Sequence, residues 1–258
     1  IVPGTDNLAA VRIDDRVMSL EEVSARILGD LRDVAQDYLG KPIERAVITV
    51  PAYYNENQRL AVRKAGAMAN LKVERILNEP TAAALTYGQQ RRKNQLVLVY
   101  DLGGGTFDAS VVRIRGDVYE VLATGGDTFL GGVDFDAQLM DYIVIEFQLE
   151  LGKLPQMERV ALLRALQAAE FAKCSLSNTK ETTINLPFIG TVDGRPVDLN
   201  VKVTRAKLEE LVIPLVGRTL EVCDAVLGQC EVKPDQLDAV LLVGGQTRMP
   251  LVQEKVKQ

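Results

Sequence analysis

Three consecutive glycines, Gly103 to Gly105, stand between Asp101 and Asp108 in the segment LVYDLGGGTFDASVVRI, residues 98–114. The glycine loops of P-loop and dinucleotide-binding proteins open a helix, and a P-loop also needs a lysine followed by serine or threonine. Here apolar and polar residues alternate after the glycines, which is typical of a strand. The segment therefore predicts a β-hairpin that carries two acids beside a glycine turn.

The backbone N–H groups of such a turn can bind an anion, and glycine lets a phosphate approach closely. A carboxylate beside a phosphate costs roughly 4 kcal/mol at ~4 Å when the effective dielectric is about 20. Asp101, Asp108 and a third candidate, Glu79, therefore favour Mg²⁺ between the acids and a polyphosphate, because Mg²⁺ is commonly shared between carboxylates and phosphates. The alternative is that the aspartates only cap a solvent-exposed turn and that Glu79 only begins a helix, where the dipole favours an acid.

A second candidate surface lies on the helix predicted at about 156–177. Glu170, Lys173 and Ser177 stand at i, i+3 and i+7 and so share one line of that helix. Three hydrogen-bonding side chains in a line could hold a ribose and the edge of a base. The same pattern is also typical of a solvent-exposed face with one ion pair.

A third candidate is the segment LLVGGQTRMP, residues 241–250, which predicts a strand, a glycine loop and a helix. Ligands of open α/β sheets bind at the carboxyl ends of strands, so Gly244 and Gly245 could let backbone approach a ligand. Arg248 offers a planar guanidinium that can stack on a base. Taken alone, this is also a common β–α turn.

Helical and strand patterns alternate along the chain, which predicts an α/β protein in two lobes that divide near residue 90 in the polar segment QQRRKNQ. A capping box of Ser19 and Glu22 begins the first helix, and Gly40 ends it. We expect its apolar residues to form a buried face: Leu20, Val23, Ile27, Leu31, Val34 and Tyr38. The other expected elements are helices at about 55–70, from 79, 134–150, 156–177, 205–229 and from 249, a hairpin at 181–203 turned at Asp193-Gly194, and a buried strand in 237–245.

Composition excludes several classes of function. The 258 residues contain no histidine, which excludes a Ser-His-Asp or Cys-His mechanism and His-ligated metal sites. A net charge of −5 argues against a nucleic-acid partner, and no apolar run or signal-peptide pattern suggests a membrane or secretion. We expect the three cysteines to be reduced, buried or half-buried thiols of a cytoplasmic protein.

Six segments in order together resemble the ATPase domain of the DnaK-type, seventy-kilodalton heat-shock chaperones, from about residue 19 to the end: VITVPAYYNENQR, ILNEPTAAALTYG, YDLGGGTFDASVV, GGVDFD, VTRAKLEEL and LLVGGQTRMP. The resemblance implies an actin-like (ribonuclease H-like) fold of two lobes, each a mixed β-sheet flanked by helices, with ATP between them. Residues 1–89 would be the latter part of lobe I and residues 90–258 lobe II, with a helical and hairpin subdomain at about 131–211.

The resemblance also implies roles for individual residues. Asp101 and Glu79 would organise Mg²⁺ through its waters, while Thr106 and Asp108 would lie beside the γ-phosphate and a monovalent cation such as K⁺. These four would be the catalytic residues for in-line attack of water on ATP. Nucleotide binding is implied for Gly103, Gly104, Gly105, Thr106, Gly132, Glu170, Lys173, Ser177, Gly244, Gly245, Gln246 and Arg248. Signalling to a peptide-binding domain is implied for Pro51 and Arg59.

The partners implied by the resemblance are a J-domain co-chaperone, a GrpE-type nucleotide exchange factor and unfolded polypeptide. We expect the family's first phosphate hairpin and its lysine to precede Ile1, and its peptide-binding domain to follow Gln258, so that this chain alone hydrolyses ATP weakly or not at all. Phe129 and Val133 depart from the histidine and glutamate that the family usually has, and Cys174 departs from the family pattern beside Lys173.

Three other functions remain possible on the residues alone. An actin-like filament-forming ATPase shares the phosphate loops, but VPAYYNENQR and NEPTAAALTYG favour the chaperone. A sugar or acetate kinase would need an acceptor pocket with a catalytic base, and no segment marks one. A degenerate binding module would retain the fold without nucleotide binding, which calorimetry with ADP and Mg²⁺ would detect.

Overall fold

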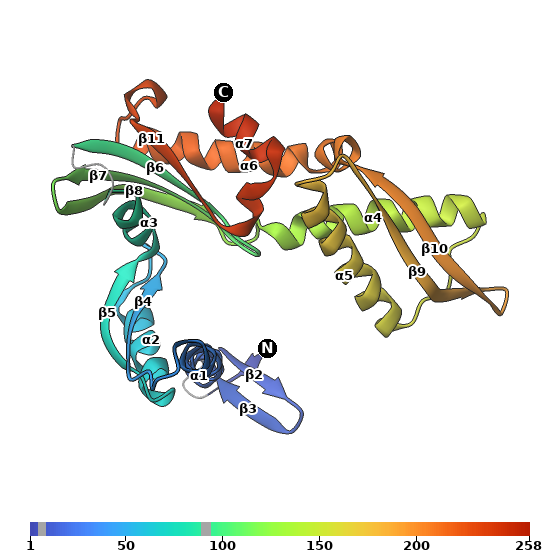
Figure 1. Ribbon diagram of the computed structural model, residues 1–258, viewed down its shortest axis with the longest axis horizontal. Helices are drawn as coiled ribbons and strands as arrows, with labels where there is room; N and C mark the ends of the chain where they lie inside the picture. Colours follow the sequence, from blue (N-terminus) through green and yellow to red (C-terminus); the bar gives the residue numbers. More distant parts are fainter. Residues whose placement is uncertain (5–8, 89–93) are drawn as a thin grey trace. The chain divides into compact units, whose positions relative to one another are not determined.

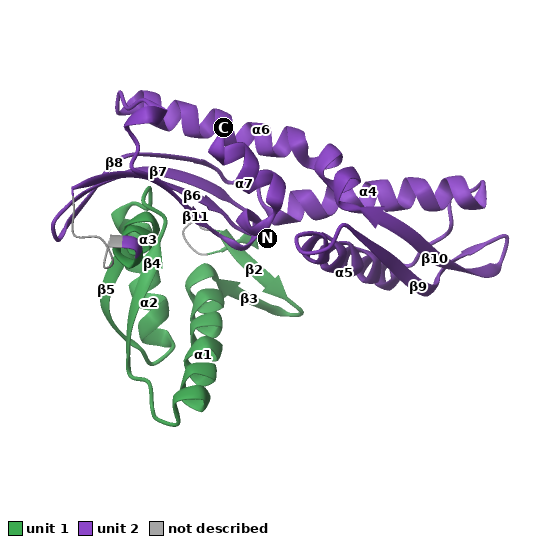
Figure 2. Ribbon diagram, turned by 45° about the horizontal axis from the view of Figure 1, so that its top comes forward, with its two compact units in different colours: residues 1–86 green, residues 87–258 purple. Residues whose placement is uncertain are grey.

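The computed structural model describes residues 1–4, 9–88 and 94–258, and the chain separates into two compact units, residues 1–86 and 87–258 (Figure 2). The segment QQRRKNQ, in which the sequence predicts the division, falls largely outside the described residues. Each unit has its own sheets and helices.

Unit 1 contains two small sheets. The first is antiparallel and three-stranded, with strands β1 (Val2–Pro3), β2 (Ala9–Ile13) and β3 (Arg16–Ser19). The second is a parallel pair, β4 (Arg45–Val50) and β5 (Lys72–Asn78). The helices are α1 (Leu20–Leu39), α2 (Glu56–Met68), which connects the parallel pair, and α3 (Glu79–Gly88), which follows β5 directly.

The predicted start and end of α1 are confirmed. The Glu22 N–H donates to Ser19 Oγ at 3.2 Å, and the Ser19 N–H donates to Glu22 Oε2 at 2.8 Å. Gly40 closes the helix in the left-handed conformation, with φ of 63°. Local sequence chemistry therefore determines both ends of this helix.

The predicted burial of the apolar face of α1 is wrong. Leu31, Val34 and Tyr38 are 60%, 67% and 88% exposed, and Ala25 is the buried residue of the helix. The helical period shows which residues share a face, whereas the element that covers a face is a tertiary matter. Helix α1 packs against α2, β2 and β3. Of the predicted face, only Val23 is half-buried, and the other five residues are exposed.

Unit 2 is built on a four-stranded mixed sheet (Figure 1). In the order across the sheet its strands are β11 (Ala239–Val243), β6 (Gln95–Leu102), β7 (Phe107–Arg115) and β8 (Val118–Asp127). Strands β6, β7 and β8 are antiparallel neighbours, and β11 runs parallel to β6. Helix α6 (Arg205–Gln229) packs on β7 and β8, over a core that contains Tyr100, Leu102 and Phe107.

The sequence predicts a buried strand within residues 237–245, and the structure corrects the burial. Strand β11 is at the edge of the sheet, and its residues are half-buried except Leu242, which is exposed. A continuous apolar run is typical of a strand covered on both faces, but the run does not say whether the strand is central. A 3-10 turn, η3 (Gly245–Arg248), and helix α7 (Pro250–Lys257) follow.

The remaining elements of unit 2 form a group beside the sheet (Figure 1). Its members are α4 (Gly132–Leu151), α5 (Arg159–Leu176), β9 (Glu181–Val192) and β10 (Arg195–Thr204). The predicted turn is confirmed, because Asp193 and Gly194 both have positive φ, 49° and 74°, as a two-residue hairpin turn requires. The short turn η2 (Pro234–Gln236) lies between α6 and β11.

The predicted α/β class, with mixed sheets and flanking helices, is confirmed. Within the described residues, no helix combines the length and the apolar character that crossing a membrane requires.

Gly66 tests the packing of α2 on β5. A Cβ at this position would lie 2.4 Å from Val73 Cγ2. We expect Gly66→Ala to destabilise the chain by about 1–2 kcal/mol, since overpacking outweighs the gain in helix propensity. Gly29→Ala, in the open interior of α1, is the matched control and should stabilise by about 0.5–1 kcal/mol. Calorimetric unfolding of the three proteins measures this, and an equal gain from both substitutions would contradict the packing.

Candidate functional site

The glycine turn between β6 and β7 is closed by a backbone hydrogen bond and is exposed on its outer side. The Gly103 N–H donates to the Thr106 carbonyl at 3.0 Å, which closes the turn. Gly104, Gly105 and Thr106 are exposed, and a Cβ added to Gly104 or Gly105 would meet nothing within 4 Å. The turn therefore has free space above its backbone for a ligand.

The two aspartates are direct cross-strand partners. The register pairs Asp101 with Asp108 at the end of the hairpin, so their side chains lie on the same face of the sheet. Both residues are half-buried. Burial raises the pKa of Asp101, and burial together with the charge of Asp101 raises the pKa of Asp108 to about 6.

Neither aspartate has a cationic partner in the described part of the chain. Their pKa values rise because no lysine or arginine compensates the burial. Opposed carboxylates are stabilised either by sharing a proton or by a cation. The pair, beside an open glycine turn, fits a hydrated Mg²⁺ that takes its other oxygens from water and phosphate, as Mg²⁺ usually does.

The first residues of α4, and Gly131 directly before it, pack on the glycine turn. The N–H groups of Gly132 and Val133 donate to the carbonyls of Gly103 and Gly104 at 2.9 and 2.8 Å. A Cβ on Gly131 would lie 2.5 Å from the backbone of Gly105. The first N–H groups of α4 are thus hydrogen-bonded to carbonyls of the turn, and the helix supports the turn from one side.

Lys173 of α5 points inward rather than into solvent. It is 8% exposed, and Nζ donates to the carbonyl of Gly132 at 3.0 Å. Nζ also lies 2.9 Å from Oδ1 of Asp136, a residue of α4 that is 6% exposed. Burial raises the pKa of Asp136, and Lys173 opposes that shift. The lysine expected at the nucleoside is therefore fixed beside the glycine turn by a buried ion pair.

The segment after β11 reaches the same place. Gln246 is buried. A Cβ added to Gly132 would lie 3.2 Å from Gln246 Oε1 and 3.1 Å from Lys173 Nζ, so both side chains border the same small space beside Gly132. Gly244 has a positive φ of 88°, and a Cβ added to it would lie 2.8 Å from Oδ1 of Asp101. Residues from four separate segments of unit 2 therefore meet at one site.

Other expected site residues of unit 2 lie around this centre. Glu170 is exposed on α5, and its charge acts on Asp136. Ser177 is half-buried at the end of α5, where its carbonyl accepts from Arg205 at 3.3 Å. Gly245 and Arg248 are exposed in η3.

The expected residues of unit 1 form a separate arrangement. Glu79 is half-buried and begins α3 directly after Asn78. The Arg59 side chain donates to Asn78 Oδ1 at 2.8 Å and to the Tyr54 carbonyl at 3.0 Å. Arg59 therefore ties the loop that begins at Pro51 to the end of the strand before Glu79.

The three departures from the family pattern are all exposed. Phe129 and Val133 are 83% and 60% exposed at the loop and at the start of α4. Cys174 is exposed as well, so the expectation that all three cysteines are buried or half-buried is wrong for this residue. Cys223 is buried and Cys230 is half-buried.

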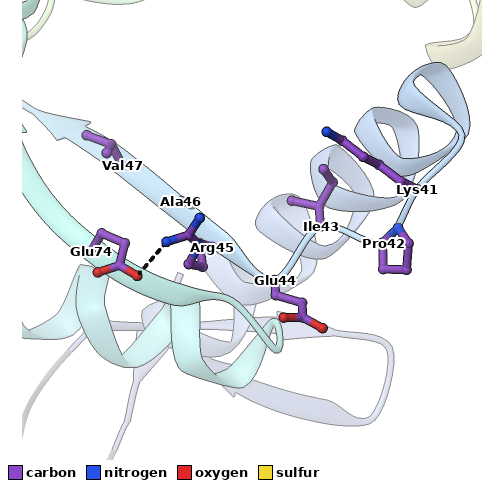
Figure 3. Close-up of a pocket in the computed structure, with 8 residues that line it drawn as sticks. All are labelled: Lys41, Pro42, Ile43, Glu44, Arg45, Ala46, Val47 and Glu74. Carbon is purple, nitrogen blue, oxygen red and sulfur yellow. Dashed lines mark ion pairs between the residues drawn. The ribbon is translucent and has the colours of Figure 1, made fainter.

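A hollow of about 440 Å³ lies in unit 1, at the beginning of β4 (Figure 3). It is lined by Lys41, Pro42, Ile43, Glu44, Arg45, Ala46, Val47 and Glu74. Its ion pair, Arg45 Nη1 to Glu74 Oε1 at 3.8 Å, is largely solvent-exposed. An open hollow with one weak surface ion pair offers no chemistry of its own.

Sequence reasoning missed Asp136 and Gly131. Both belong to the segment GGVDFD, and Asp136 is an acid on the side of α4 that buries Phe135 and Leu139. A charged residue among buried apolar neighbours needs a partner of opposite charge. The position of Asp136 beside the apolar residues of this helix is the signal that could have identified it.

A scan against protein-family models matches the Hsp70 protein family over residues 1–258. The match accords with the α/β architecture of mixed sheets flanked by helices and confirms the predicted actin-like ATPase fold. It does not favour the filament-forming alternative.

The raised pKa of Asp108 predicts a pH-dependent stability. Between pH ~4, the unfolded value, and pH ~6 the folded chain holds a proton on Asp108 that the unfolded chain has released, so the contribution of Asp108 to stability falls as pH rises through this range. Asp108→Asn should flatten this slope in metal-free buffer and stabilise at pH 7 by about 1 kcal/mol, a figure reduced because the carboxylate is half-exposed.

Urea unfolding at several pH values measures the effect. The exposed Asp117→Asn at the β7–β8 turn is the control and should retain the slope of the unaltered chain. A slope in Asp108→Asn as steep as in the unaltered chain would refute the assignment.

Proposed function

The chain belongs to the Hsp70 protein family, a family of chaperones with an ATPase domain, and from that premise we propose that it binds ATP and ADP with Mg²⁺ at the glycine turn of unit 2. The observation that carries the proposal is the pairing of Asp101 with Asp108 beside an open turn. In the described residues the two acids have no cationic partner, and their pKa values are raised. Bound Mg²⁺ would compensate both charges and attract phosphate oxygens.

We assign the phosphates to the exposed backbone of Gly103, Gly104 and Gly105. Free space above the turn supports this placement, and glycine permits the close approach. Thr106 and Asp108 are proposed to lie beside the γ-phosphate and K⁺.

The nucleoside is proposed to lie beside the buried Lys173. Its ammonium is a donor for ribose oxygens, and Gln246 and Gly132 lie within the same small space. We assign the outer contacts to the residues around this centre: Glu170, Ser177, Gly244, Gly245 and Arg248.

Hydrolysis by this chain is proposed to be weak. The transition state for phosphoryl transfer depends on cations placed around the γ-phosphate. In the described residues of unit 2, no lysine or arginine donates a hydrogen bond to residues 103–106, so protein cations that would stabilise the γ-phosphate are lacking there. Asp101 and Glu79 are proposed to orient Mg²⁺ and its waters.

The wider cycle is proposed from family membership. We propose that nucleotide state is coupled, through Pro51 and Arg59, to binding of unfolded polypeptide, as in the DnaK-type chaperones. A J-domain co-chaperone and a GrpE-type exchange factor are the proposed partners. The cytoplasm is the proposed compartment, supported by three cysteines that remain thiols.

Gly104→Ala tests the phosphate turn. The added methyl group meets no protein atom, so the unfolding temperature should stay within about 1 °C of that of the unaltered chain. The methyl group would occupy the space of the phosphates, and we expect MgADP to bind at least about tenfold more weakly, which is about 1.4 kcal/mol. Isothermal titration calorimetry measures the affinity.

Gly217→Ala in α6, also in open space, is the control and should bind MgADP normally. Equal affinity in Gly104→Ala would remove the turn from the nucleotide site.

Removal of the metal tests the role of the acids. With EDTA in place of Mg²⁺, ADP should bind the unaltered chain about tenfold more weakly, because the acids then repel the phosphates. The double substitution Asp101→Asn and Asp108→Asn should make ADP affinity nearly independent of Mg²⁺. A double variant that keeps the full dependence on Mg²⁺ would place the metal elsewhere.

A further inference from the structure

The ion pair between α4 and α5 lies at the centre of the candidate site. Lys173 and Asp136 are 8% and 6% exposed, and their charged atoms are 2.9 Å apart. Asp136 Oδ1 has no well-directed hydrogen bond in the described residues, so its main stabilisation is the charge of Lys173. A buried charge without its partner is strongly disfavoured, so each member fixes the other.

We propose that Asp136 is a positioning residue for nucleotide binding, which holds the Lys173 ammonium, charged and oriented, beside the phosphate turn. The inference rests on the proposed function of the site and adds to it a residue from a different helix. Asp136 acts through Lys173 and need not contact the nucleotide.

The geometry leaves Lys173 little alternative. The side chain bridges α5 to α4, and Nζ donates to the carbonyl of Gly132, the residue whose N–H binds Gly103 in the turn. Nζ donates to the Gly132 carbonyl and pairs with the charge of Asp136, and lysine has three N–H donors, so the ammonium keeps donor capacity for a ligand. The ion pair with Asp136 therefore holds the ammonium in the place from which it can reach a ligand.

Two acids act at this place: Asp136 of α4 pairs with the ammonium, and the exposed Glu170 of α5 acts on Asp136. Gln246 and Gly104, which do not titrate, lie 3.2 and 3.5 Å from the position that a Cβ on Gly132 would take. Asp136 is thus the buried titratable group that faces the ammonium.

Asp136→Asn is the primary test, with calorimetric titration of MgADP into the whole chain at pH 7 and pH 9. A buried ammonium without a carboxylate releases its proton more readily, so affinity should fall about tenfold at pH 7 and further at pH 9. The unaltered chain should lose much less between these pH values. A merely structural role would lower the unfolding temperature without this added loss at high pH.

Asp193→Asn is the matched control. It removes the partner of another lysine, Lys153, at 2.7 Å in an exposed pair at the β9–β10 turn. Its affinity and pH profile should equal those of the unaltered chain.

The double variant Asp136→Asn with Lys173→Met covers the case in which Asp136→Asn does not fold, because it leaves no buried charge unpaired. If Asp136 acts through Lys173, the double variant should bind MgADP as weakly as Lys173→Met alone.

The outcomes separate the two proposals. Failure of the unaltered chain to bind MgADP overturns the proposed function and this inference with it. Normal, pH-independent binding by Asp136→Asn, or a double variant clearly weaker than Lys173→Met, overturns the inference alone.

Discussion

The antiparallel register between β6 and β7 is the constraint on which the rest of unit 2 depends. It places Tyr100, Leu102 and Phe107 in the core and puts Asp101 opposite Asp108 on the other face. A slip of one residue would exchange the two faces, so the acids would enter this core and the aromatic rings would leave it. The cost of that exchange fixes the register, and the register fixes the distance between the acids. The chemistry of the site is in this sense a consequence of core packing.

Around this hairpin the site is assembled by backbone-to-backbone contact. A Cβ on Gly131 would collide with Gly105, one on Gly126 would lie 2.5 Å from Asp108 Oδ1, and one on Gly244 would lie 2.2 Å from the carbonyl of Leu102. These glycines let three separate segments approach the ends of β6 and β7 without side chains between them. The contacts bury the acids in part, which raises their pKa values and makes the pair receptive to a cation.

Apolar surface remains exposed in both units. In unit 1 it is the face of α1, and in unit 2 a hollow of about 800 Å³ lies between β6, β11, α6 and α7, with the half-buried Leu237 and Val240 and the exposed Leu242 in its lining. The sequence predicted burial for the face of α1 and for the strand that became β11. The spacing of apolar residues shows that a face could be buried. Whether it is buried depends on whether another element packs against it.

The sequence by itself determined the features that depend on neighbours along the chain: the capping box of α1, the hairpin turn at Asp193-Gly194, the hairpin of β6 and β7, and the α/β class. These follow from local hydrogen bonds and from periodicity, which a single sequence contains. Only the tertiary structure decided that Lys173 pairs with Asp136 and that Gln246 joins them, because these partners are far apart in sequence. It also decided which apolar faces stay open, since burial depends on what packs against a residue.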